Sequence, residues 1–164
     1  MAQLARTVIG CLLATQVWAL PDDRQQAIEI NADEAVINEQ ANAATYRGSV
    51  DVRQGSFVLT ADRLDLALDS TGAVSRMEAA GTPATFQSKR RATDTEPVRG
   101  QANTLPYTLS TATVQLVGAA KITLDGSTFE GPEIRYHTET GEITGSGTRE
   151  RRVQMIFAPP SGTP

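Results

Sequence analysis

The residues that could carry out catalysis are few, and their placement does not favour it. The chain has one histidine, His137, and one cysteine, Cys11, whereas transition-metal sites usually need two or more such ligands. The carboxylates Asp62 and Asp65 flank Arg63, a pattern that favours a solvated sheet face over an acid–base pair. No nucleophile elbow, phosphate-binding loop or dinucleotide fingerprint occurs. The sequence therefore predicts a protein that is not an enzyme and that uses no metal and no other cofactor.

The charge pattern argues against nucleic-acid binding. The formal net charge is −4, and no basic stripe is present, although such a stripe is the electrostatic mark of proteins that bind a phosphate backbone. The densest basic cluster is Lys89, Arg90 and Arg91, which lies in a polar stretch. Its simplest interpretation is a solvated loop. The alternative is contact with phosphorylated headgroups, which guanidinium groups bind well.

The dominant pattern is an alternation of apolar and polar residues, clearest over residues 45–69. Successive side chains of a strand point to opposite faces, so this alternation predicts sheets with one apolar and one solvated face. Gly48 and Gly55 are expected to mark turns.

The same pattern returns after 70 residues. Tyr46, Gly48, Val50, Val52 and Gln54 fall on Leu116, Gly118, Ala120, Ile122 and Leu124, and Leu59, Ala61, Leu64 and Leu66 fall on Phe129, Gly131, Ile134 and Tyr136. Shorter echoes at a spacing of 29 relate residues 28–32 to 57–61 and residues 98–102 to 127–131. Such a period predicts stacked supersecondary units, none of which buries its apolar face alone.

The chain as a whole is predicted to be all-β, with about 14–16 short antiparallel strands in a sandwich, jelly roll or barrel. Residues 34–44 have some helix propensity, but the repeat favours a strand at 35–38. Pro106 predicts an edge strand or a bulge. The expected organisation is a signal peptide at 1–19, a flexible leader at 20–27, one β domain at 28–157 and a disordered tail at 158–164.

The first 19 residues resemble an export signal. Arg6 precedes an uncharged apolar run over residues 7–17, which is too short to span a bilayer, and Val17 and Ala19 fit a cleavage site before Leu20. Cleavage would remove Cys11, so the exported chain would form no disulfide. Cys11 also gives a superficial lipoprotein signal, but it comes before most of the apolar run. Cleavage after Ala19 argues against a membrane-tethered protein.

Four segments carry a resemblance to a known family: residues 45–66 (TYRGSVDVRQGSFVLTADRLDL), 81–86 (GTPATF), 97–102 (PVRGQA) and 116–120 (LVGAA). Over residues 28–147 the chain resembles the OstA-like LptA family of periplasmic lipopolysaccharide-transport proteins. The resemblance implies an open, twisted antiparallel β-jelly roll in the periplasm. It also implies binding of lipopolysaccharide through lipid A, and head-to-tail assembly with its own copies and with related domains of the inner- and outer-membrane complexes. Residues 151–164 do not align with the family.

The resemblance also implies lipid-contact positions, at which this chain has Ile28, Phe86, Leu105 and Leu109. Exposing an acyl chain to water costs about 0.8 kcal/mol per CH₂ group, so a carrier of such lipids needs a continuous apolar trough. Nondirectional contacts along the trough would come from Leu59, Leu64, Leu66, Leu109, Phe129 and Ile134. The alternative for each residue is ordinary core packing in a structural, self-assembling β protein.

A third reading is a secreted carbohydrate-active enzyme, which would need clustered carboxylates and exposed aromatic residues. Aromatic residues make up only 5% of the chain, which disfavours this reading.

An open roll would leave unpaired N–H and C=O groups on its first and last strands. A second copy or a related domain could add there by strand pairing.

Overall fold

The structure is a computed structural model that describes residues 25–91 and 93–159. The predicted signal peptide, the first part of the predicted leader and residues 160–164 of the predicted tail lie outside these ranges. Within the described ranges, no helix has the length and apolar character needed to cross a membrane.

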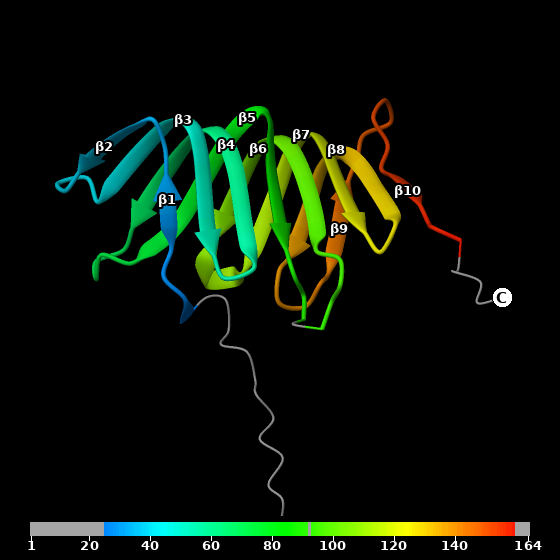
Figure 1. Ribbon diagram of the computed structural model, residues 1–164. Coiled ribbons are helices and arrows are strands. Elements are labelled where there is room, and N and C mark those ends of the chain that lie inside the picture. The colour runs from blue at the N-terminus through cyan, green and yellow to red at the C-terminus, as the bar shows by residue number, and fades with distance from the viewer. Residues whose placement is uncertain (1–24, 92, 160–164) are drawn as a thin grey trace, which may run out of the picture.

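Ten strands form one antiparallel sheet in the order β1-β3-β4-β5-β6-β7-β8-β10, while β2 also pairs with β3 and β9 also pairs with β8 (Figure 1). A short 3-10 helix, η2 (Leu109–Thr111), connects β6 to β7. The strands are β1 (Glu29–Asn31), β2 (Glu34–Asn38), β3 (Ala43–Gln54), β4 (Phe57–Leu68), β5 (Val74–Ser88), β6 (Val98–Thr108), β7 (Thr113–Leu124), β8 (Ser127–His137), β9 (Ile143–Ser146) and β10 (Gln154–Ile156). The all-β class, the open antiparallel roll and the strand at residues 35–38 are therefore confirmed.

The expected number of strands was too high. The described chain has ten strands, and the six from β3 to β8 are 11 to 15 residues long. Gly55 lies in a turn as expected, but Gly48 lies inside a strand, and so do Gly81 and Gly118. The chain passes through these glycines without reversing direction, so pairs of predicted short strands are single long ones.

Pro106 is also placed differently from the prediction. It lies in β6, which has β5 and β7 on its two sides. The register with β7 is unbroken around it, because Thr104 pairs with Val117 and Tyr107 pairs with Val114. Pro106 therefore marks neither an edge strand nor a bulge.

A line of irregularities crosses the sheet near the middle of its long strands. The register shifts between Arg47 and Val50, Thr60 and Arg63, Ala80 and Ala84, Gln101 and Thr104, and Val117 and Ala120. Extra residues in one strand of a pair make that strand bend. Figure 1 shows the strands arching over along the top of the view. The single sheet thus folds into two facing layers joined along this line, which we call the bend.

The first layer contains β1, β10 and the strand halves at residues 50–54, 57–60, 84–88, 98–102, 120–124 and 127–131. The second layer contains β2, β9 and the halves at residues 43–47, 63–68, 74–80, 104–108, 113–117 and 133–137. One inward-facing row of paired residues crosses each layer from edge to edge. The first-layer row is Ile30, Val52, Leu59, Phe86, Gly100, Ile122, Phe129 and Met155. The second-layer row is Ile37, Ala44, Leu66, Met77, Tyr107, Val114, Tyr136 and Ile143.

The structure contains the 70-residue repeat as two hairpins with the same register. Tyr46 pairs with Leu64 in β3–β4, and Leu116 pairs with Ile134 in β7–β8. At the bend, φ is +76° at Gly48 and +79° at Gly118, a conformation that glycine adopts without steric cost. The repeat therefore encodes both the strand pairing and the position of the bend.

Gly100 provides a test of how tightly the layers are packed. A Cβ atom at Gly100 would collide with the ring of Phe86, which is 2% exposed. We expect Gly100→Ala to lower the free energy of unfolding by about 1 to 3 kcal/mol, as overpacking does, measured by urea denaturation. In a Phe86→Leu background the cost of Gly100→Ala should be clearly smaller. An equal cost in both backgrounds would contradict a collision with the ring.

Candidate functional site: an apolar interior with two open edges

The nine residues predicted to contact lipid all belong to the interior between the layers. Six are buried, and the other three are half-buried and pack against the core. The buried residues are Leu59, Leu64, Leu66, Phe86, Leu105 and Ile134, and the half-buried residues are Ile28, Leu109 and Phe129. Alternation had placed residues such as Leu59, Leu64 and Leu66 on the inward face, whereas Ile28, Phe86 and Leu105 came from the family resemblance. Their packing in this structure is also that of a protein core, so lipid contact stays a prediction for each of them.

Stacked aromatic rings connect the two layers. Phe57 of the first layer stacks on Tyr107 of the second, with ring centroids 5.1 Å apart, and Phe86 stacks on Tyr136 at 5.8 Å. Phe57 and Phe86 also stack on each other at 6.1 Å. Of these four rings, only Phe86 was predicted to contact lipid. Phe57, Tyr107 and Tyr136 also occupy inward positions of the apolar–polar alternation, so the same pattern could have predicted that they face the interior.

Tyr136 carries a polar group in this interior, where Gln54 and Ser88 are also buried. Its side chain is fully buried, and its hydroxyl group has no hydrogen-bond partner among the residues that the structure describes. Burial raises the pKa of Tyr136 to about 12, while Arg90 acts to lower that pKa and Asp94 to raise it. The phenol is therefore protonated at neutral pH and available as a donor.

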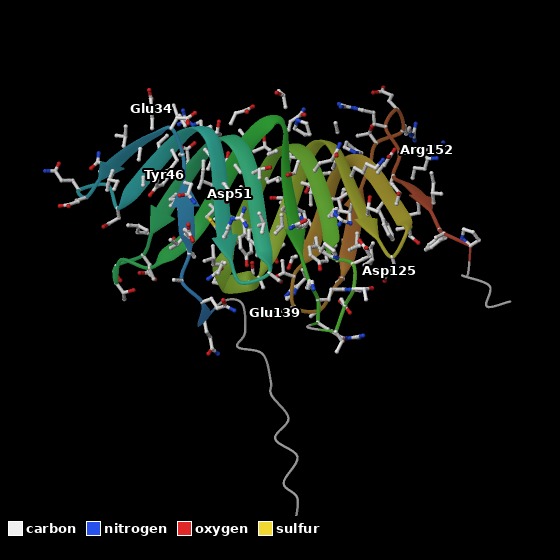
Figure 2. All side chains as sticks on the ribbon, in the orientation of Figure 1. Glu34, Tyr46, Asp51, Asp125, Glu139 and Arg152 are labelled. Carbon is white, nitrogen blue, oxygen red and sulfur yellow. The ribbon has the colours of Figure 1, made fainter. Side chains whose placement is uncertain are left out.

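Opposite the bend, the interior is bounded by two rows of turns that we call the seam. The turns at residues 55–56 and 125–126 belong to the first layer, and those at 69–72 and 138–141 to the second. Figure 2 shows Asp125 and Glu139, one from each row, toward the bottom of the molecule. At the seam both layers end in turns, and no described strand passes from one layer to the other.

The basic cluster of the sequence lies at this seam. Arg90 donates to Asp125 at 2.9 Å and forms an ion pair with Asp94 at 3.4 Å. Its side chain also lies against Gly141 of the second layer. Lys89 and Arg91 are exposed, as expected of a solvated loop. Arg90 instead holds the connection between β5 and β6 in place through its contacts with neighbouring residues. Phosphate contact by this cluster stays a hypothesis.

Both edges of the sheet expose apolar side chains. At the N-terminal edge, Val36 and Ile37 are 57% and 66% exposed, and at the C-terminal edge Met155, Ile156 and Phe157 are 47%, 55% and 71% exposed. Ile37 and Met155 are the last members of the two inward rows, so the apolar interior continues to the edges.

The two edges also differ in charge. The N-terminal edge carries the exposed carboxylates of Glu29, Glu34 and Glu39. The segment between β9 and β10 has a net positive charge, because it carries three exposed arginines and one exposed glutamate: Arg149, Arg151, Arg152 and Glu150. Figure 2 shows Glu34 and Arg152 at opposite ends of the molecule. The two ends of the molecule are therefore opposite in charge.

The outer face of the first layer bears a shallow polar groove of about 510 Å³, lined by residues such as Thr60, Thr85 and Gln101. Its cations already have partners. Arg53 pairs with Asp51 at 2.6 Å, Arg99 with Glu96 at 3.0 Å, and Lys121 with Glu130 at 2.9 Å. This groove is a neutralised, solvated face and does not provide free positive charge for an anion.

His137 and Asp65, two of the polar residues considered for catalysis, make contacts within the fold. His137 accepts a hydrogen bond at Nδ1 from the backbone N–H of Thr140, in the turn between β8 and β9. Within the described residues, no group of three or more His, Cys, Asp or Glu side chains could hold a metal ion. Arg63 and Asp65 form an ion pair on the outer face, as the alternation predicted.

Comparison with known proteins identifies the family. Residues 29–142 match the family model described as the LptA/(LptD N-terminal domain) LPS transport protein. The chain belongs to the LptA family of lipopolysaccharide-transport proteins. It is 34% identical to the lipopolysaccharide export system protein LptH of Pseudomonas aeruginosa, in an alignment that covers 92% of this chain and 89% of LptH. It is 28% identical to LptA of Escherichia coli K12, with 90% and 80% covered.

The fold agrees with this assignment. The crystal structure of LptH, described as the LptA-homologous periplasmic component of the conserved lipopolysaccharide transport device of P. aeruginosa, matches with a TM-score of 0.79 and 30% sequence identity. The match covers 85% of this chain and all of the LptH chain. Membership of the LptA family confirms the resemblance seen in the sequence and the prediction of a transport protein rather than an enzyme.

The outward Arg63–Asp65 pair gives a test of the register and of the pH dependence of stability. Arg63 donates to Asp65 at 2.7 and 2.8 Å, and Thr45 also donates to it at 2.7 Å. The bonds from Arg63, followed by the bond from Thr45, lower the pKa of Asp65. The resulting stability is present above the pKa of an unfolded aspartate, about 4, and is lost as pH falls through the folded-state pKa.

We expect Asp65→Asn to lower the free energy of unfolding by roughly 0.5 kcal/mol at pH 7, since the pair is partly exposed. The difference from the unsubstituted protein should shrink as pH falls below about 4, measured by urea denaturation from neutral to acidic pH. Asp62→Asn, at the exposed bend, is the matched control. A difference that stayed constant with pH would contradict this account.

Proposed function

We propose that this protein is a periplasmic carrier that shields the acyl chains of lipid A between its two layers and bridges the inner- and outer-membrane transport complexes. The observation that carries the proposal is the pair of inward rows, which are almost entirely apolar and each of which crosses one layer from edge to edge. Each ends in an exposed apolar residue, Ile37 at one edge and Met155 at the other. A lipid between the layers would meet no charged side chain along either row.

The physical requirement is continuity of apolar surface. A lipid with several acyl chains would lose tens of kcal/mol in water at about 0.8 kcal/mol per exposed CH₂ group. Aliphatic contacts from residues such as Leu59, Leu105 and Ile134 are nondirectional, so a chain can exchange one contact for the next with little change in free energy. Such a surface favours sliding over tight binding at a single position.

Continuity across the periplasm requires that the rows join between molecules. Free edge strands pair readily with other strands, and the exposed apolar residues at both edges would be buried by such pairing. Opposite charge steers association and favours one orientation, here the acidic N-terminal edge against the basic C-terminal segment. We infer head-to-tail contact with a second copy or with a related β-jelly roll domain of a membrane complex.

A structural, self-assembling β protein with a closed core is the second candidate. The observation that favours it is the tight packing of the interior, where Leu59, Leu64 and Leu105 have no exposed surface and stacked rings connect the layers. The two candidates differ in whether acylated molecules enter between the layers.

Photocrosslinking in cells that make lipopolysaccharide tests the carrier function. A photoreactive amino acid at Phe86 or at Leu109 should give lipopolysaccharide adducts, because both side chains face the interior. The same amino acid at Asp65, on the outer face, is the control and should give none. Folded, exported protein without adducts at Phe86 and Leu109 would favour the closed structural core.

Self-association tests the role of the edges. We expect Ile156→Asp to weaken concentration-dependent assembly at least about tenfold, because a charge replaces an apolar side chain in a desolvated contact. Val117→Asp is the matched control, since Val117 is 39% exposed but lies next to the bend, in the middle of the sheet. Sedimentation velocity over a range of concentrations measures both. Equal assembly of the two variants would exclude β10 from the contact.

A further inference from the structure

Tyr136 is the buried polar group that the apolar conduit leaves unexplained. Its hydroxyl lies in a fully buried side chain and has no partner among the described residues. Leaving a hydroxyl unpaired in an apolar environment costs free energy, and phenylalanine would fill the same space without that cost. A buried, unsatisfied group of this kind requires a reason in a stable fold.

The position of Tyr136 indicates what the hydroxyl could meet. Tyr136 is the penultimate residue of β8, and only His137 separates it from the turn at 138–141 in the seam. Its ring stacks on Phe86 across the interior, and the charged groups that influence it, Arg90 and Asp94, belong to the connection between β5 and β6 on the opposite side of the seam. The hydroxyl therefore lies between the apolar interior and the polar margin.

An acylated glycolipid has matching chemistry at this depth. Its chains need the apolar interior, its sugars and phosphates need water, and between them lie the ester and amide linkages of the acyl chains. A linkage carbonyl is a neutral acceptor and can leave water at a modest cost, whereas a desolvated phosphate carries a far larger penalty. A protonated phenol is a donor and pairs with such a carbonyl.

We propose that the Tyr136 hydroxyl donates a hydrogen bond to the carbonyl oxygen of an acyl ester or amide linkage of the bound lipid when the two layers part to admit its chains. This inference rests on the proposed carrier function. It gives the conduit one directional contact among many nondirectional ones, which would set the depth of the lipid headgroup relative to the seam. No covalent step is involved.

Tyr136→Phe removes the hydroxyl and keeps the ring, so the variant should fold. In the ligand-free protein we expect a melting temperature higher by on the order of 3 °C, because an unsatisfied buried group is lost. Binding of tetra-acylated lipid A, measured by titration calorimetry, should weaken roughly three- to tenfold, as expected for the loss of one hydrogen bond.

An ether-linked analogue of the same chain lengths, which has no carbonyl groups, is the control probe and should bind both proteins equally. Tyr46→Phe is the control variant: it removes the same hydroxyl from a half-buried tyrosine near the N-terminal edge (Figure 2). It should give no loss that is specific to the carbonyl-containing probe. An equal loss for both probes, or no loss, would overturn the inference.

A lower melting temperature of Tyr136→Phe would mean that the hydroxyl is already bonded within the ligand-free protein, and would overturn the inference as well. If the unsubstituted protein bound neither probe, the carrier function itself would be rejected. Binding by the unsubstituted protein with an indistinguishable Tyr136→Phe variant would reject only the role of Tyr136.

Discussion

The bend is the constraint on which the rest of this structure depends. A sheet with one apolar face must cover that face, and the described part of this chain has no second sheet and no long helix to do so. Register shifts in the middle of the long strands let the sheet cover itself. The positive φ angles at Gly48 and Gly118 are the local conformations that permit this at equivalent positions of the two repeated hairpins.

Folding one sheet over produces an interior that is closed along one side only. A barrel would join its first and last strands and remove both edges, whereas here β1, β2, β9 and β10 leave both ends of the sheet unpaired on one side. The rows of inward side chains therefore end in exposed Ile37 and Met155. Edge exposure is a liability in an isolated β protein, but in the proposed head-to-tail assembly it would let the apolar rows of adjacent domains connect.

Sequence alternation predicted which residues face inward within each half of a strand, because successive side chains point to opposite faces. It therefore placed Leu59, Leu64 and Leu66 correctly, and the repeat predicted the shared register of the two hairpins. The number of strands was wrong because a glycine at a bulge and a glycine at a turn have the same local signature, as Gly48 and Gly55 illustrate. The stacking of Phe57 on Tyr107 was not predicted, since contacts between layers depend on where the sheet bends.

The two sides of the interior differ in how the layers are held together, and under the proposed carrier function this difference determines where a lipid would enter. At the bend every long strand passes from one layer to the other, so separation there would require breaking strand pairing in several places. At the seam the contacts between layers are stacked rings, such as Phe57 on Tyr107, and the packing of Arg90 against Gly141. A ring pair contributes on the order of 1 kcal/mol beyond its buried area, and acyl chains that replace it restore much of the apolar contact. Opening at the seam, with the bend as a hinge, is therefore the route of lowest cost into the interior.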